Sequence, residues 1–205
     1  MATRRSLLAS LLALTAGITA LGVATDGFQA FTTETARRID VRERPRALPD
    51  ARLETADGHL VNLSHWQGRW VLVEFIYTRC PASCSKQGIE FAHLHDRLVG
   101  PIARGGVALL SISFDPTYDT PERLAGYQLR SGDRGGSWIA ARPVGAASLA
   151  ALKDAFGVIA IPDGQGGFVH NAAIAVVNPE GRLVAIVDWD MPQAAVALVT
   201  ESDGP

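Results

Sequence analysis

The sequence contains very little cysteine, with two residues in a chain of 205. Two cysteines cannot build a framework of several disulfides, and they cannot supply the four thiolates of a cysteine-only zinc site. There is no excess of basic residues either, because 19 Lys and Arg stand against 21 Asp and Glu. The composition therefore gives no indication of a nucleic-acid partner. Hydrophobic residues make up 47% of the chain, which is enough to bury the core of one globular domain.

Only one hydrophobic run is long, the 18 residues from Leu7 to Ala24, and it directly follows Arg4-Arg5-Ser6. Its length is the lower limit for crossing a hydrocarbon core of about 30 Å. The segment also resembles a twin-arginine export signal, and its small residues at 22–24 offer a cleavage point. We therefore expect residues 1–25 to be a signal or membrane-anchor segment, and both alternatives remain open. The next basic residue is Arg37, so the charge asymmetry places the rest of the chain outside the cytoplasm, in a disulfide-permissive bacterial periplasm.

Residues 26–49 carry mixed charges, two prolines and no apolar period, and we interpret them as a linker. Residues 50–205 are expected to form one α/β domain. An Asp57-Gly58 pair predicts a β-hairpin near its start. Strands are predicted at Trp70–Tyr77, Val107–Phe114, Ala172–Val177 and Arg182–Val187, and helices at Ser85–Val99, from Thr120 onward, at Ser148–Phe156 and at Gln193–Thr200.

This order of elements, ββ–β–α–β–α–(β)–α–β–β–α, predicts a thioredoxin-like fold. Its mixed central sheet would be flanked by helices, with the β-hairpin and the apolar helix preceding it. Trp70–Tyr77 would be the central strand, since it is almost continuously apolar. Its carboxyl end would deliver the next loop to a helix N-terminus, where such α/β folds place their chemistry.

Both cysteines lie in that loop, as Cys80-Pro-Ala-Ser-Cys84. A helix N-terminus and the adjacent Arg79 favour the thiolate form of a cysteine. Thiolate is both the nucleophile of disulfide exchange and a soft ligand for Cu(I). The alternatives are a structural disulfide or two small buried side chains. The position of both cysteines in one loop favours a functional pair, and the three intervening residues favour a shared metal over a two-residue redox motif.

A copper site of this kind needs a nitrogen ligand as well. His170 ends a glycine-rich segment, residues 162–169, directly before a predicted strand. In a thioredoxin-like layout this segment packs against the cysteine loop, so a trigonal site of Cys80, Cys84 and His170 is expected. We assign the remaining histidines to solvent or to the core: His59, His65, His93 and His95.

Two acidic residues follow the strand Val107–Phe114. Asp115 ends at the same sheet edge as the cysteines, and it is equally compatible with a supporting role beside the copper ligands and with an ordinary turn. For Asp119 we favour turn and helix-cap chemistry, because it precedes the expected cap Thr120.

Several motifs, in order and at domain-scale spacing, resemble the Sco/SenC family of cytochrome oxidase assembly proteins over residues 50–190. They are Gly68-x-x-Val71-Leu72-Val73-x-Phe75, Tyr77-Thr78-x-Cys80-Pro81-x-x-Cys84, Ser113-Phe114-Asp115-Pro116-x-x-Asp119-Thr120-Pro121-Glu122, and His170 before a strand and Asn178-Pro179-Glu180-Gly181. Where the family commonly has Asp before the histidine, this chain has Val169.

The resemblance implies that one copper ion, Cu(I) or Cu(II), binds per chain through Cys80, Cys84 and His170. It implies a metallochaperone held at the inner membrane by its N-terminal helix. Its partners would be a copper donor protein and the copper-bearing subunit of cytochrome c oxidase, whose binuclear site it would load. The alternative is a thiol–disulfide oxidoreductase or redox sensor, in which Cys80 and Cys84 would be catalytic. We favour the chaperone, which is not an enzyme in the turnover sense.

Overall fold

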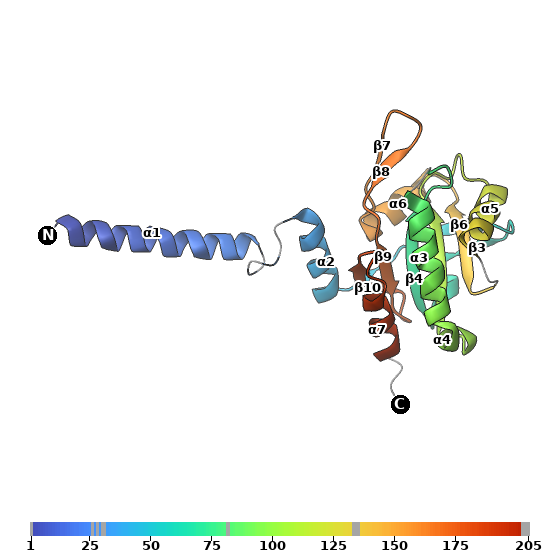
Figure 1. Cartoon of the computed structure of the whole chain (residues 1–205), viewed down its shortest axis with the longest axis horizontal. Coiled ribbons are helices and arrows are strands. Elements are labelled where there is room, and N and C mark those ends of the chain that lie inside the picture. The colour runs from blue at the N-terminus through green and yellow to red at the C-terminus, as the bar shows by residue number, and fades with distance from the viewer. Residues whose placement is uncertain are drawn as a thin grey trace. The chain divides into compact units, whose positions relative to one another are not determined.

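The computed structural model describes residues 2–25, 27, 29, 32–80, 83–132 and 136–201, without the side chains of residues 2–5 and 83–85. The chain divides into two compact units, residues 1–43 and 44–205. Figure 1 shows the helices of the first unit and the sheet of the second.

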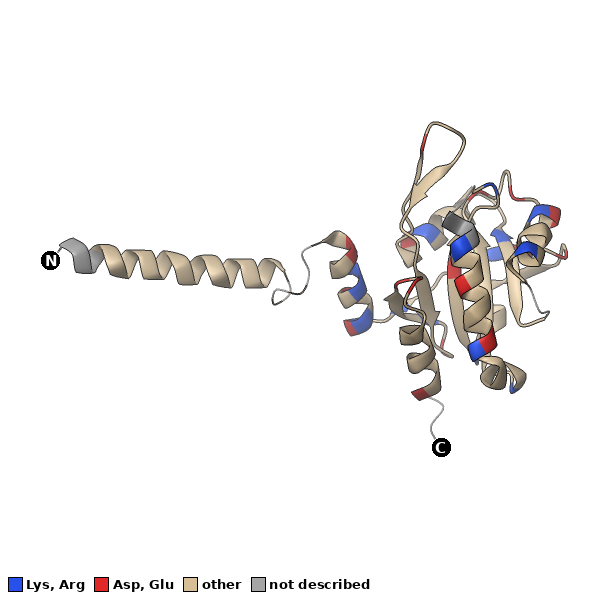
Figure 2. Ribbon diagram, in the orientation of Figure 1, with Lys and Arg blue, Asp and Glu red and all other residues tan. Residues whose placement is uncertain are grey.

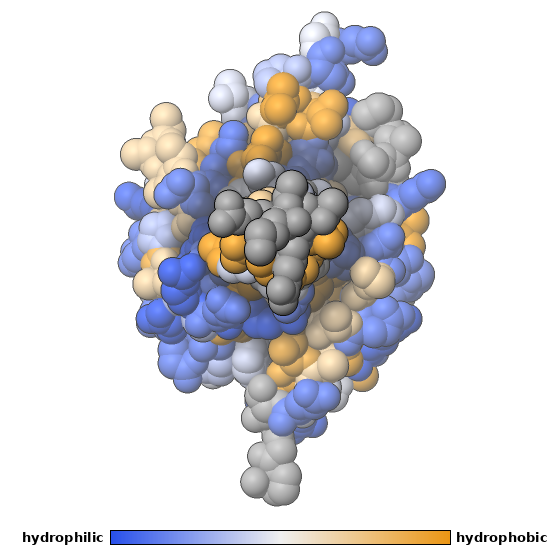
Figure 3. Space-filling model, turned by 90° about the vertical axis from the view of Figure 1, so that its left-hand side faces the viewer, coloured by the Kyte–Doolittle hydropathy of each residue, from blue (hydrophilic) through white to orange (hydrophobic). Residues whose placement is uncertain are grey.

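The first unit contains the helices α1 (Ala2–Ala24) and α2 (Thr33–Glu43). Within α1, the 19 residues Ser6–Ala24 are long and apolar enough to cross a membrane, judged by length and composition. The leucines of α1 are exposed, and Figure 3 shows the apolar side chains of the helix as orange surface. The helix therefore fits the predicted signal or anchor segment.

Residues 26–49, which we interpreted as a linker, contain the helix α2 and the short strand β1, and the sequence predicted neither element. Figure 2 shows that α2 is densely charged. Its helix is stabilised locally, because Thr32 Oγ1 accepts a hydrogen bond from Thr35 N at 3.1 Å and Glu34 pairs with Arg37 and Arg38 at 2.5 and 3.0 Å. Such i,i+3 and i,i+4 pairs stabilise a polar helix that has no apolar stripe to reveal it. Beyond α2, strand β1 (Arg46–Ala47) joins the sheet of the second unit.

The second unit is built on an eight-stranded mixed sheet with the order β1-β10-β9-β4-β5-β6-β2-β3. Three parallel strands form its centre, and β9 runs antiparallel to β4. The carboxyl ends of β4 and β5 therefore share an edge with the beginning of β9. The strands are β2 (Arg52–Thr55), β3 (Leu60–Asn62), β4 (Trp70–Ile76), β5 (Val107–Ser113), β6 (Trp138–Pro143), β9 (Ile174–Val177) and β10 (Arg182–Val187).

Helices cover both faces of this sheet, and alternate residues of β4 face each side. Leu72 and Ile76 pack in the core with residues of α3 (Ser83–Arg97), α5 (Pro121–Ser131) and α7 (Gln193–Glu201). On the other face, the Phe75 ring contacts Phe156 of α6 (Ala146–Phe156) at 5.1 Å. The predicted thioredoxin-like arrangement, with Trp70–Tyr77 in the central strand, is confirmed.

Some elements were not predicted. These are the 3₁₀ turn η1 (Leu63–Trp66), the short helix α4 (Val99–Ala103), and a hairpin of β7 (Ala160–Pro162) and β8 (Phe168–His170).

The hairpin replaces the glycine-rich loop expected before His170, and it projects beyond the sheet in Figure 1. Asp163 Oδ1 accepts hydrogen bonds from Gln165 N and Gly167 N, at 2.8 and 2.9 Å. Gly164 and Gly166 adopt φ of +77° and +91°, which a side chain rarely permits. The glycines and Asp163 that suggested an irregular loop are therefore the residues that form the turn of this hairpin.

Candidate metal centre

The cysteine loop leaves the carboxyl end of β4 and enters α3, which begins at Ser83. Cys80 is half-buried and lines a cavity of about 80 Å³ between the loop, α3 and α5. Cys84 lies in the first turn of α3, as predicted for a thiol near a helix N-terminus. Its side chain lies outside the described residues, as do Pro81 and Ala82.

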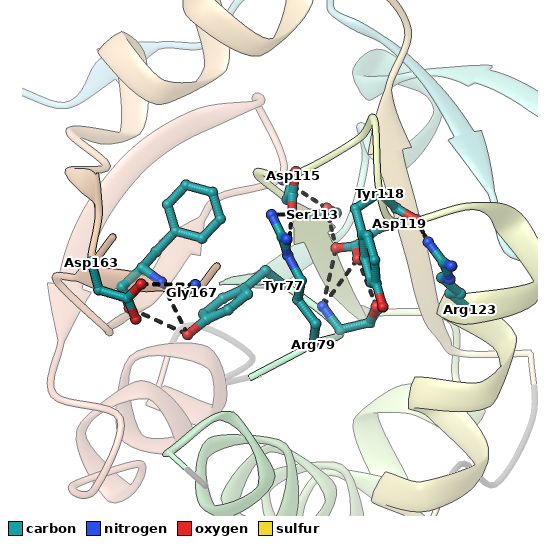
Figure 4. Close-up of polar contacts among 11 residues, drawn as sticks. Tyr77, Arg79, Ser113, Asp115, Tyr118, Asp119, Arg123, Asp163 and Gly167 are labelled. Carbon is teal, nitrogen blue, oxygen red and sulfur yellow. Dashed lines mark hydrogen bonds and ion pairs between the residues drawn. The ribbon is translucent and has the colours of Figure 1, made fainter. Parts of the chain in front are cut away.

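A buried carboxylate fixes the beginning of this loop. Asp119, which is fully buried, accepts hydrogen bonds from Thr78 N at 3.1 Å and from Thr78 Oγ1 at 2.6 Å. Ser113 Oγ donates a third, at 2.6 Å. Figure 4 shows these bonds converging on one side chain. Burial raises the pKa of Asp119, and the bonds from Ser113 and Thr78 oppose that rise. Asp119 lies in the predicted turn before the N-cap Thr120, but its carboxylate has a role that the sequence did not indicate, because it connects β5 to the cysteine loop.

Asp115 acts on the loop through Arg79, the neighbour of Cys80. Arg79 donates to Asp115 Oδ2 from Nε at 3.0 Å, and its NH2 group lies 2.8 Å from the same oxygen. The guanidinium also lies over the Tyr118 ring, at 4.6 Å from its centroid (Figure 4). The Arg123 guanidinium also lies over the Tyr118 ring, at 3.7 Å from its centroid. Asp115 thus offsets the positive charge that was expected to favour a Cys80 thiolate.

Tyr77 connects the cysteine loop to the hairpin. Its hydroxyl donates to Phe168 O at 3.2 Å and accepts from Phe168 N at 3.3 Å. The Tyr77 ring also contacts the imidazole of His170, with ring centroids 6.0 Å apart. Phe114, directly after β5, contacts the same imidazole, with ring centroids 5.1 Å apart. The structure therefore brings His170 to the sheet edge where the cysteine loop begins, as the sequence predicted.

The environment of His170 favours a neutral imidazole. Burial lowers the pKa of His170, because the ring is half-buried against aromatic groups. A neutral imidazole is the form that binds a metal ion. Val169 points away from this site and is exposed, as strand alternation requires.

The remaining histidines lie in the surroundings predicted for them. His59 pairs with Asp57 at 2.8 Å in the exposed β2–β3 turn. His65 and His93 are also exposed, while His95 is buried and its Nε2 lies 2.8 Å from Ser137 Oγ.

No cluster of three potential ligands occurs among the side chains that the structure describes, a set that excludes Cys84. Tyr77 nevertheless links Cys80 and His170, because its ring contacts the imidazole of His170 and it directly precedes the loop that carries Cys80. Thiolate sulfur and neutral imidazole nitrogen are donors that suit copper. The chemistry of the donors therefore fits the predicted ligand set.

Comparison with known proteins decides the family. A sequence model of the SCO1/SenC family matches residues 40–202, which is most of the chain and includes Cys80, Cys84 and His170. The chain belongs to the SCO1/SenC family. A Stutzerimonas stutzeri protein whose name proposes copper binding is 28% identical to this SCO1/SenC protein over 148 residues, 68% of each chain.

Solved structures share the fold of this SCO1/SenC protein. Bradyrhizobium japonicum ScoI, solved with copper bound, is 26% identical with a TM-score of 0.64, over 76% of this chain and 98% of that one. BsSco, described as a Sco-family cytochrome c oxidase assembly protein with a disulfide switch, is 18% identical with a TM-score of 0.68, over 78% and 94%. The latter likeness concerns the fold alone.

Sequence reasoning missed three functional contacts of this site. They are the Asp119 bonds to the loop, the Tyr77 hydroxyl on the hairpin, and the engagement of Arg79 by Asp115. Asp119 stands in the motif that carried the family resemblance, so the motif was a usable signal. The Tyr77–Phe168 contact joins residues 91 positions apart, and no local pattern indicates it.

Proposed function

We propose that this SCO1/SenC protein is a copper chaperone that binds one copper ion through Cys80, Cys84 and His170. It would pass the ion to the copper-bearing subunit of a cytochrome c oxidase after receiving it from a donor protein. Copper is then the cargo of the protein and not a resident cofactor. The observation that carries the proposal is the seating of a neutral His170 against Tyr77, the residue from which the cysteine loop departs.

The contacts of the site suit a ligand set that must accept and release an ion. Cys80 and Cys84 come from a loop held at one end by Asp119, while His170 comes from a hairpin held by Tyr77. The ligands therefore belong to two separately supported segments.

The N-terminal segment supports a location at a membrane. The apolar stretch Ser6–Ala24 fits a single anchor in the inner membrane, with residues 44–205 in the periplasm. A cleaved export signal is the alternative. The mass of the protein recovered from membranes distinguishes the two.

The second candidate function is thiol–disulfide exchange on the cysteines of the oxidase. The pairing of two cysteines around a helix N-terminus favours it, as does the disulfide switch described for BsSco. Exchange requires the two sulfur atoms and does not require His170, so the histidine separates the two functions.

The decisive experiment is the substitution His170→Ala in the full chain, with the exposed His93→Ala as a matched control. Copper binding is measured anaerobically against competing chelators, together with absorption spectra of the Cu(II) form. We expect one Cu(I) per reduced chain in all three proteins. Loss of a nitrogen ligand costs Cu(II) more than Cu(I). His170→Ala should therefore lose at least about 10–100-fold in Cu(II) affinity and its thiolate charge-transfer band.

Two results would contradict this proposal. The first is wild-type Cu(II) affinity and spectra in His170→Ala, which would exclude His170 from the ligand set and favour a redox dithiol. The second is equal copper loading of diamide-oxidised and reduced protein, since a disulfide has no thiolate to offer.

A further inference from the structure

A carboxylic acid lies in the central strand where an apolar residue is expected. Glu74 is fully buried in β4, between Val73 and Phe75, six positions before Cys80. Its side chain faces α3 and α5, as those of Leu72 and Ile76 do. Burying an ionisable group in a sheet is costly unless its partners satisfy it. The role of Glu74 therefore depends on its hydrogen-bond partners, since Glu74 is not one of the proposed copper ligands.

The hydrogen bonds of Glu74 are asymmetric. Oε1 accepts from Ser111 Oγ at 2.6 Å and from the Tyr127 hydroxyl at 2.8 Å. Oε2 has no hydrogen-bond partner within the part of the chain that the structure describes. An unpaired oxygen of this kind is better suited to a neutral carboxylic acid than to a permanent carboxylate. Burial raises the pKa of Glu74 to about 7, and the side chains of Ser111, Tyr127 and Gln87 oppose that rise.

Tyr127 connects this carboxyl group to the cysteine site. Its hydroxyl bonds to Glu74 Oε1, and the same residue lines the cavity that Cys80 lines. A cavity of about 80 Å³ is large enough to hold water, and Tyr127, Thr78 and Ser131 offer it polar partners. A hydrogen-bonded path can thus run from the Cys80 thiol through the cavity and the Tyr127 oxygen to Glu74.

The charged and titratable groups beside this path include Asp119, which accepts a hydrogen bond from Thr78 in the cavity wall. Ser111 and Trp138 face Glu74 from β5 and β6, where Trp138 Nε1 donates to Ser111 Oγ at 2.8 Å. Gln87 faces the carboxyl group from α3, and Ile174 is its neighbour on β9. From α5 come Tyr127 and, in the cavity wall, Arg130. A positive charge at Arg130 stabilises a thiolate and a carboxylate alike, so it does not decide which of them holds the proton.

We propose that Glu74 is the proton acceptor of the cysteine site, reached from Cys80 through the cavity and the Tyr127 hydroxyl. Copper binding breaks the S–H bond of the thiol, and the sulfur keeps the electron pair as its thiolate. The proton passes into the cavity, from which the Tyr127 oxygen accepts a proton. At the same time the hydroxyl proton of Tyr127 moves to Glu74 Oε1, and the carboxylate becomes a neutral acid. On copper release the same steps run backwards. Glu74 is a positioning and proton-holding residue, and it does not touch the metal.

This inference rests on the proposed function, since it assumes that copper displaces thiol protons. Metal binding to cysteine releases protons to the buffer, and these can be counted. The test loads full-length reduced protein with Cu(I) alone and measures proton release with a pH indicator between pH 5 and 9. Glu74→Gln keeps the shape of the side chain but cannot take a proton. Glu90→Gln, which replaces a half-buried carboxyl group of α3, is the matched control.

We expect wild type and Glu90→Gln to release fewer protons per copper than Glu74→Gln, by a fraction of one proton. The difference should be greatest near and just above neutral pH and should vanish at pH 5, where Glu74 is already protonated. Tyr127→Phe provides a second test should Glu74→Gln fold poorly. Removing a hydrogen bond to the ionised form raises a carboxyl pKa. The pH range in which the protein releases fewer protons per copper than Glu74→Gln should therefore move to higher pH.

The outcomes separate the two proposals. Equal proton release from wild type and Glu74→Gln at every pH, with Cu(I) bound by both, overturns the role of Glu74 and leaves the chaperone intact. Failure of wild type to bind Cu(I) overturns the chaperone. In that case the pH profile of cysteine alkylation by iodoacetamide still tests Glu74, since a profile unchanged by Glu74→Gln refutes the proposal.

Discussion

Replacing Glu74 by glutamine should change how the stability of the domain depends on pH. A carboxyl group whose folded pKa is raised binds a proton in the folded state that it releases on unfolding. Below its ordinary value of 4.5 both states are protonated, and above about 7 both are ionised. Between these values the wild type loses stability as the pH rises, by about 1.36 kcal/mol for each pH unit. The interval corresponds to roughly 3 kcal/mol, a large share of the stability of a typical domain.

Urea unfolding of the full chain in detergent, followed by tryptophan fluorescence, measures this loss. All four tryptophans lie between residues 66 and 189, so the signal reports on the second unit. The informative quantity is the free energy of unfolding of wild type minus that of Glu74→Gln. It should fall by about 3 kcal/mol between pH 4.5 and 7.5 and then level off. Asp119 also has a raised pKa, but it is present in both proteins and its contribution cancels.

A difference that stays constant across this pH range would refute the reasoning. It would mean that Glu74 has the same pKa in the folded and unfolded states, so that burial is offset by its hydrogen bonds. A difference that grows with pH would mean that the folded state prefers the carboxylate. The matched control is Glu90→Gln, since the hydrogen bonds of Glu74 come from Ser111 and Tyr127.

Three further predictions concern the support of the cysteine loop. Asp119→Asn replaces an acceptor of three hydrogen bonds, so it should lower the free energy of unfolding by about 1–3 kcal/mol and speed the alkylation of Cys80. If both quantities stay unchanged, Asp119 does not hold the cysteine loop. Tyr77→Phe removes the hydroxyl bound to the backbone of Phe168 and should cost about 1 kcal/mol and increase hydrogen exchange at that amide, whereas unchanged exchange would disprove the link. Gly88→Ala would place a Cβ 2.7 Å from Ser131 Oγ and 2.9 Å from the Tyr127 hydroxyl, so it should destabilise by about 1–3 kcal/mol. The matched Gly126→Ala meets only the flexible end of Arg130 and should stabilise by up to about 1 kcal/mol; equal signs for the two would refute the clash.

The sequence alone determined the class of fold and the candidate ligands of this protein. Continuous apolar runs marked β4 and β5 as buried central strands, and their order with the helices gave the thioredoxin-like arrangement. The same order placed His170 at the edge of the sheet that receives the cysteine loop. Such inferences succeed because burial and strand order are encoded in local composition and periodicity.

Local patterns failed where stability came from polar contacts. Helix α2 has no apolar stripe and is held by a cap and ion pairs, so the sequence did not predict a helix within the linker. The β7–β8 hairpin was interpreted as a loop, because its glycines and Asp163 are also the residues of irregular turns. In both cases the deciding interactions are hydrogen bonds and charges that hydrophobic periodicity does not report.

Only the tertiary structure decided what surrounds the ligands. Asp119 reaches Thr78 across 41 positions, Tyr77 reaches Phe168 across 91, and Tyr127 reaches Glu74 across 53. Sequence spacing carries no information about contacts of this range, because they depend on how the strands and helices pack. The sequence indicated Cys80, Cys84 and His170 as candidate ligands. Only the folded chain showed that Asp119 holds the cysteine loop and that Glu74 bonds to Tyr127 beside the Cys80 cavity. Burial then sets the protonation of those groups, since an ionised carboxylate loses its hydration when the sheet and helices close around it.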